Sequence, residues 1–254
     1  MTLIAIGGAE GKSGDMAVLR RVLAEAGVET PRVLVITTAT GYPEEVGQTY
    51  RDAFAELGIA CDVMHVSTQA GANDAATIRR IETADVVFFT GGDQSRLAAV
   101  FNGSDALKAL QSRHEAGGVI AGTSAGAAAM SSLMICGGNP DEAMTKGEVE
   151  TGEGFGLAPG AVFDTHFMNR GRLKRLFAIT AAAPAKTGIG LDEDTGVILR
   201  AGGEAEVIGS GAVTLVDAKE LKNCNIAEIA PGEEIRAEGF RVTTLKAGGT
   251  FKLG

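Results

Sequence analysis

Apolar runs and helical segments alternate along the first half of the chain. Short apolar runs typical of buried strands are followed by stretches in which apolar residues recur at helical spacing. The runs lie at Leu3–Ile6, Val33–Ile36, Cys61–Val66, Val86–Thr90 and Val119–Ala121. The helical stretches lie around Leu19–Ala26, Val46–Leu57, Thr77–Thr83, Leu97–Phe101, Leu107–Ala116 and Ala125–Met134. Strands that alternate with helices predict parallel βαβ units and a sheet covered on both faces.

The carboxyl-terminal part has a different pattern, in which apolar runs are separated by glycine-rich turns. These runs lie at Val197–Leu199, Glu206–Ile208, Val213–Val216 and Arg241–Leu245. Short runs bounded by turn residues are typical of antiparallel strands. Since no repeat or linker interrupts the chain, residues 1–254 are predicted to form a single α/β domain. Its mostly parallel sheet is flanked by helices, as in flavodoxin-like folds, and extra C-terminal antiparallel strands complete it.

Small or polar residues stand directly after four of the predicted strands. They are Gly7-Gly8, Thr37-Thr38, Gly91-Gly92 and Ser124. Ligands of open parallel sheets bind outside the carboxyl ends of the strands. We therefore expect four loops to meet at one crevice.

Composition excludes several classes of function. The chain has 254 residues and a net charge of −9, without the positive footprint of a nucleic-acid-binding protein. No apolar run reaches the roughly 18 residues of a membrane span, and the amino-terminal segment lacks the basic residues of a secretory signal. The three cysteines and three histidines are scattered, so we expect reduced thiols, a cytoplasmic location and no metal or other cofactor.

Gly122-Thr123-Ser124-Ala125-Gly126 fits the Gly-x-Ser-x-Gly pattern between a predicted strand and a predicted helix. A sharp turn there raises the serine oxygen above the sheet edge, and the glycines remove Cβ atoms that would clash. The Ala125 amide, at the start of the helix, can then face a developing oxyanion. Ser124 is thus a candidate nucleophile.

A nucleophilic serine needs a base and a group that orients the base. His166 is the best placed of the three histidines, because it ends a predicted strand beside charged residues. Asp192, Glu193 and Asp194 follow another apolar run, and spacing alone does not choose among these acids. The order serine, histidine, acid differs from that of α/β-hydrolases.

Arg170, Arg172 and Arg175 follow His166 closely in an otherwise acidic chain. Guanidinium groups hold carboxylates in bidentate geometry, which points to a substrate that carries carboxylates. The stretch from Gly7 to Ser13 resembles a phosphate-binding loop, but Ile6 stands where that motif requires glycine. We therefore reject nucleotide binding.

These motifs together resemble the serine peptidase family S51, to which cyanophycinases belong and whose fold is similar to class I glutamine amidotransferases. The resemblance covers most of the chain, including Gly7–Glu10, Val35–Ala39, Phe89–Gln94, Gly122–Ala127, Asp164–Phe167, Arg170–Leu176 and Gly190–Thr195. It implies a triad of Ser124, His166 and Glu193. It also implies an oxyanion hole from amides of Gly92, Asp93 and Ala125.

The resemblance further implies a substrate pocket and a substrate. The matching pocket residues are Gln94, Asp164, Arg170, Arg172 and Arg175, with Thr165 where the family pattern has glutamine. Cyanophycinases cleave the poly-aspartate backbone of cyanophycin, which carries arginine on each β-carboxyl, and release β-aspartyl-arginine. Asp164 would bind the substrate guanidinium. The alternatives are an aspartyl dipeptidase of the same family and a non-catalytic binding module of the same fold. Family members are often dimers, so the resemblance allows a homodimer.

Overall fold

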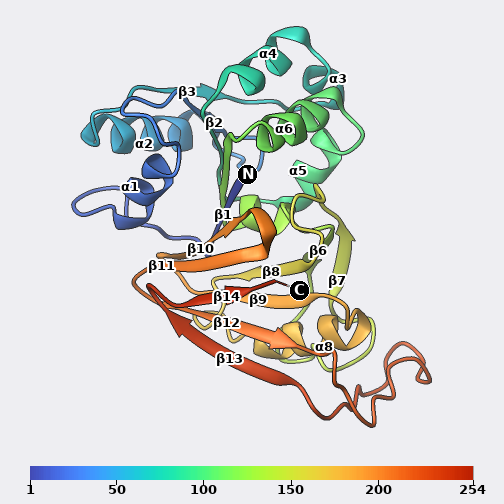
Figure 1. Ribbon diagram of the computed structural model, residues 1–254. Helices are drawn as coiled ribbons and strands as arrows, with labels where there is room; N and C mark the ends of the chain where they lie inside the picture. Colours follow the sequence, from blue (N-terminus) through green and yellow to red (C-terminus); the bar gives the residue numbers. More distant parts are fainter. Residues whose placement is uncertain (254) are drawn as a thin grey trace.

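A mixed eight-stranded sheet organises the computed structural model, which describes residues 1–253 (Figure 1). Its strand order is β14-β11-β10-β1-β5-β4-β2-β3. The parallel strands are β1 (Thr2–Ile6), β2 (Val33–Ile36), β3 (Cys61–Met64), β4 (Val86–Phe89) and β5 (Val119–Thr123). Antiparallel β10 (Thr195–Arg200), β11 (Glu204–Gly209) and β14 (Thr250–Lys252) extend the sheet beyond β1. The predicted fold class is confirmed.

Alternation along the buried strands separates the helices into two layers. Ile4 and Val35 pack with Phe54 on one face, which is covered by α1 (Ala17–Ala24) and α2 (Pro43–Glu56). Ala5 and Ile36 point the other way, because successive side chains of a strand face opposite sides. That face is covered by α3 (Gln69–Ala72), α4 (Ala75–Thr83), α5 (Gln94–Phe101), α6 (Asp105–Glu115) and α7 (Ala125–Ala129).

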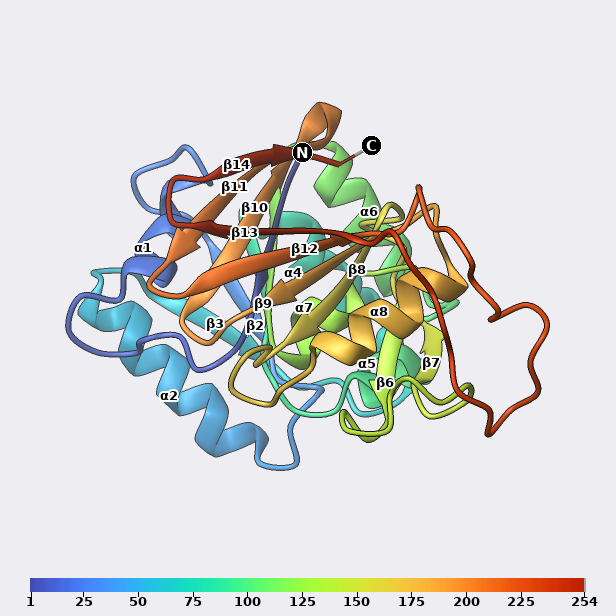
Figure 2. The same cartoon turned by 90° about the horizontal axis from the view of Figure 1, so that it is seen from below.

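A second sheet packs beside this helical layer and carries part of the site (Figure 2). Its strands, in order, are β13 (Arg241–Lys246), β12 (Ala212–Asp217), β9 (Thr187–Leu191) and β8 (Ala161–Thr165). Phe163 and Ile189 join the same apolar cluster as Phe89 of the main sheet. On the outer face Val162 packs with Leu176 of α8 (Leu173–Ala182). The core is therefore continuous between the sheets.

Two connections complete the antiparallel parts of the sheets. The 3-10 turn η1 (Ala201–Gly203) joins β10 to β11, and an irregular segment, 218–240, joins β12 to β13.

Among residues 1–253, no helix combines the length and the apolar character needed to cross a bilayer.

One predicted helix is shorter than expected. The helix expected over Ala125–Met134 ends at Ala129, and Leu133–Gly137 forms β6, which pairs with β7 (Glu150–Glu153). The physical reason is a pairing between separate segments, because the partner strand β7 lies outside the helical stretch and the local period of apolar residues does not reveal it.

Gly126 of α7 provides a test of how closely the nucleophile turn packs. A Cβ atom at this position would lie 2.5 Å from the carbonyl oxygen of Phe89. Although alanine is favoured over glycine inside a helix, we expect Gly126→Ala to lower the free energy of unfolding by about 1–3 kcal/mol, since a main-chain atom must move. Urea denaturation measures this change.

Gly41→Ala is the matched control. Apart from Gly41 and its two chain neighbours, no heavy atom lies within 4 Å of a Cβ built there, so we expect a change within about 0.5 kcal/mol. Equal stability of the two variants would show that the turn tolerates a side chain.

Candidate active site

Ser124 occupies a strained turn between β5 and α7. Its φ is 52° and its ψ is −111°, and its amide donates a hydrogen bond of 2.9 Å to the Ile6 carbonyl. A Cβ on Gly122 would lie 2.6 Å from the carbonyl carbon of Gly126, and one on Gly126 would lie 2.5 Å from the Phe89 carbonyl oxygen, so both positions need glycine. This is the backbone shape that presents a serine hydroxyl above a sheet edge.

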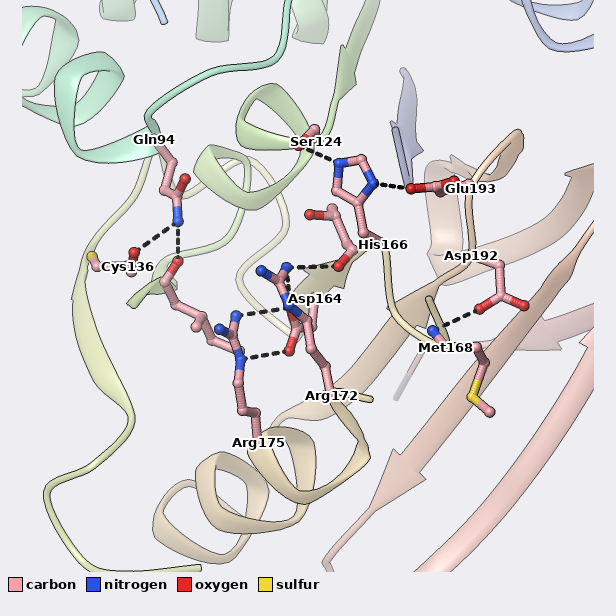
Figure 3. Close-up of polar contacts among 12 residues, drawn as sticks. Gln94, Ser124, Cys136, Asp164, His166, Met168, Arg172, Arg175, Asp192 and Glu193 are labelled. Carbon is pink, nitrogen blue, oxygen red and sulfur yellow. Dashed lines mark hydrogen bonds and ion pairs between the residues drawn. The ribbon is translucent and has the colours of Figure 1, made fainter. Parts of the chain in front are cut away.

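Ser124, His166 and Glu193 form one hydrogen-bonded chain (Figure 3). His166 follows β8, and its Nε2 lies 3.0 Å from Ser124 Oγ. Glu193 follows β9, and its Oε1 lies 2.7 Å from His166 Nδ1. Residues that follow three different strands are thus brought together at one end of the two sheets.

The order of donors in this chain follows from the chemistry of its groups. An ionised carboxylate only accepts, so Glu193 holds a proton on His166 Nδ1 and leaves the Nε2 lone pair facing the serine hydroxyl. Asn169 Nδ2 donates to the other Glu193 oxygen at 3.1 Å. No sequence pattern indicates a role for Asn169, because only the fold brings it to Glu193.

The two aspartates beside Glu193 have other partners. Asp192 accepts from the amides of Met168 and Ala212, at 3.2 and 3.1 Å. Asp194 accepts from the Gly11 amide at 3.1 Å and from the Ser210 hydroxyl at 2.7 Å. Of the three acids that spacing left open, Glu193 is therefore the one that contacts the imidazole.

The predicted oxyanion donors do not all remain available. Ala125 is the first residue of α7, where an amide has no intrahelical acceptor. Among residues 1–253 the Gly92 amide also has no acceptor. The Asp93 amide, however, donates to the Ala39 carbonyl at 3.0 Å, and its carboxylate caps α5 at the Ser95 amide. The prediction for Asp93 is not met, because this amide is already bonded.

Arg172 and Arg175 both contact the carboxylate of Asp164 (Figure 3). Arg175 binds Asp164 through two hydrogen bonds of 3.0 and 2.9 Å, and the two residues are 4% and 2% exposed. Arg172 Nη1 lies 3.3 Å from Asp164 and donates to the Thr165 carbonyl at 2.7 Å. Burial raises the pKa of the Asp164 carboxyl, and the two guanidinium groups oppose this shift.

In this structure these predicted pocket groups make internal contacts. Asp164, proposed from the sequence to bind a guanidinium of the substrate, binds two of the protein's own. Thr165 is buried. Gln94 Nε2 donates to the carbonyls of Ile135 and Cys136, at 2.9 and 3.0 Å.

A cavity of about 450 Å³ lies beside Ser124 and His166. As expected, the loops at Gly8, Gly91-Gly92 and Ser124 line it, together with Arg170. The loop at Thr37-Thr38 does not; both threonines are buried, and Thr38 donates to the Val66 carbonyl. The lining also includes residues that the sequence analysis did not assign to the site: Ala9, Glu10, Lys12, Val46, Thr49, Tyr50 and Thr123. Glu10 and Lys12 belong to the stretch rejected as a phosphate-binding loop.

Comparison with known proteins identifies the family. Residues 3–208 match the model of Peptidase family S51. Cyanophycinases from Synechococcus elongatus and Trichormus variabilis are each 34% identical over 99% of this chain, and over 79% and 85% of their own lengths. A cyanophycinase from Geminocystis herdmanii is 32% identical over 98% of this chain and 93% of its own length.

Solved structures agree with the fold. A peptidase from an acI-B1 Actinobacterium superposes with a TM-score of 0.75 at 19% identity, over 99% of this chain and 96% of the other. A putative peptidase E from Listeria monocytogenes EGD-e has a TM-score of 0.59 at 16% identity, over 83% and 98%. At such identities the likeness concerns the fold alone, whereas the family match extends over most of the sequence. The chain therefore belongs to peptidase family S51 and is a serine peptidase.

Proposed function

We propose that this peptidase hydrolyses cyanophycin and releases β-aspartyl-arginine through an acyl-enzyme. The observation that carries the proposal is the hydrogen-bonded chain from Ser124 through His166 to Glu193 beside an open cavity. The substrate is inferred from the cyanophycinase relatives, which match nearly the whole chain.

In the first half of the reaction, Ser124 Oγ attacks a backbone carbonyl carbon of the substrate. His166 Nε2 takes the hydroxyl proton as the new C–O bond forms, and Glu193 stabilises the resulting imidazolium. The amides of Ala125 and Gly92 donate to the oxyanion. The amide of Asp93, which the family resemblance also implies, is left out of this set. When the C–N bond breaks, His166 returns the proton to the leaving amine.

In the second half, water hydrolyses the ester. His166 takes a proton from the water as its oxygen bonds to the acyl carbon. The bond between the acyl carbon and Ser124 Oγ then breaks, and Oγ recovers a proton from the imidazolium. The product leaves as a carboxylic acid, and the enzyme returns to its starting state.

Of the residues that the resemblance places in the substrate pocket, Arg170 is the one that lines the cavity. It is exposed, and among residues 1–253 its guanidinium has no ion-pair partner. Each unit of cyanophycin carries an arginine carboxylate, which a guanidinium binds through charge-assisted hydrogen bonds. We assign Arg170 to this carboxylate. Asp164, Arg172 and Arg175 are positioning residues that hold the backbone just before His166.

Ser124→Ala removes the nucleophile, so we expect clearing of a cyanophycin suspension to slow by about 10³-fold or more. Glu193→Gln removes the charge that stabilises the imidazolium and is expected to cost about 10²–10⁴-fold. The control Ser112→Ala changes an exposed serine of α6 and keeps full activity. Product masses identify the dipeptide.

Other outcomes select the alternatives. No clearing by the wild type, with cleavage of short aspartyl peptides that needs Ser124, indicates an aspartyl dipeptidase. No cleavage of either substrate and no labelling of Ser124 by a serine-directed sulfonyl fluoride indicates a binding module.

Arg170→Met keeps the length of the side chain and removes its charge. Because the lost contact is made in both the ground state and the transition state, we expect KM to rise about tenfold or more with little change in kcat. Steady-state kinetics measure both constants. Arg79→Met, on an exposed part of α4, is the control. An unchanged KM for Arg170→Met would remove Arg170 from the substrate site.

Asp164→Asn tests the assignment of the buried charges. The substitution leaves two guanidinium groups without their counter-charge, so we expect the free energy of unfolding to fall by about 3–5 kcal/mol. Asp62→Asn, in an exposed pair with Arg80, is expected to cost about 0–1 kcal/mol. A stable Asp164→Asn variant with a raised KM would instead return Asp164 to the substrate.

A further inference from the structure

Part of the cavity beside Ser124 has no role in the mechanism above. It is formed by Glu10 and Lys12, on the loop after β1, and by Val46, Thr49 and Tyr50 of α2. The cavity thus has a second cationic side chain in addition to Arg170, contributed by a different segment of the chain.

Glu10 is a buried carboxylate whose oxygens are already occupied. Its Oε1 accepts a hydrogen bond of 2.5 Å from the Tyr50 hydroxyl and lies 3.0 Å from Lys12 Nζ. Its Oε2 accepts one of 2.5 Å from the hydroxyl of Thr123. Burial and the adjacent Glu10 charge raise the pKa of Tyr50 well above its usual value, so the phenol stays protonated and donates. Glu10 is therefore an internal counter-charge.

Lys12 is held in place by these neighbours. Its ammonium contacts Glu10 Oε1, donates to the Glu10 carbonyl at 3.2 Å and lies 5.1 Å from the centre of the Tyr50 ring. An ammonium has three N–H groups, so one donor remains, and 29% of the side chain is exposed. A side chain fixed in this way loses little conformational entropy on binding a ligand.

We infer that Lys12 binds a carboxylate of the substrate at a subsite separate from that of Arg170. Glu10 balances one of the two cations, so the lining keeps a positive charge within a protein of net charge −9. The inference rests on the proposed function, because cyanophycin presents a carboxylate on every unit. Two cationic subsites on one cavity bind the carboxylates of two different units.

Position-specific binding tests this inference. The ligands are a three-unit cyanophycin oligomer and three analogues, each with one arginine carboxylate replaced by a carboxamide. They are titrated calorimetrically into Ser124→Ala, which does not turn them over. We expect one analogue to bind at least about tenfold more weakly than the unmodified oligomer, because it lacks the carboxylate that contacts Lys12. In Lys12→Met, this difference in affinity is expected to disappear for that analogue and to remain unchanged for the other two.

Three further variants sharpen the result. Lys12→Arg keeps the charge and retains the preference. Lys12→Met combined with Glu10→Gln removes both charges, so that no unpaired carboxylate is left buried, and it shows the same loss. Lys108→Met removes a cation that is paired with Asp105 on the surface, and it leaves every preference intact.

The outcomes separate this inference from the proposed function. If Lys12→Met weakens all four oligomers equally, or none, Lys12 only neutralises Glu10 and the inference is wrong. Tri-aspartate and its three single asparagine forms are titrated in parallel. If these peptides show the same position-specific loss of affinity and the oligomers do not bind, the Lys12 subsite stands and cyanophycin is not the substrate. No binding of either series, while the wild type clears cyanophycin, contradicts the subsite alone.

Discussion

Three successive carbonyl oxygens at the end of β1 hold the loops that carry the site. The Ile6 carbonyl accepts from the Ser124 amide at 2.9 Å and the Gly7 carbonyl from the His166 amide at 2.8 Å. The Gly8 carbonyl accepts from the amide of Asp194, next to Glu193, at 2.8 Å. One strand end thus sets the relative positions of loops that follow β5, β8 and β9. The distances between Ser124, His166 and Glu193 depend on this backbone, and the side chains then complete the arrangement.

This convergence is crowded, which explains its glycines and its strain. A Cβ on Gly7 would collide with the main chain of Leu191 and Asp192, and one on Gly8 with the His166 ring. Ala9, Ser124, His166 and Asp194 are four of the six non-glycine residues with positive φ, so most such strain in residues 1–253 is concentrated here. Strained residues persist where surrounding contacts over-determine them, and they gather at functional sites.

Local pattern was enough to predict the alternating strands and helices and the loops that follow the strands, because both depend on neighbouring residues. It failed where the outcome depends on distant partners. The helix predicted over Ala125–Met134 runs into the first two residues of β6, because the pairing of β6 with β7 is not visible in the local pattern. The family resemblance implies the Asp93 amide as an oxyanion donor, and its bond to the Ala39 carbonyl of another loop is visible only in the structure. Spacing could not choose Glu193 over Asp192 and Asp194; the family resemblance named it, and the structure shows it bonded to His166.

Burial separates charged residues that look equivalent in sequence. Arg172 and Arg175 are three residues apart at the start of α8, so they lie on one side of the helix and share Asp164. Arg170 precedes the helix and faces the cavity. Glu10 and Lys12, on the loop after β1, differ in the same way: the buried Glu10 carboxylate is bonded at both oxygens, whereas Lys12 keeps a free donor. Since a buried charge needs a partner within the protein, the cations left partly exposed in the cavity are the ones a substrate carboxylate can reach.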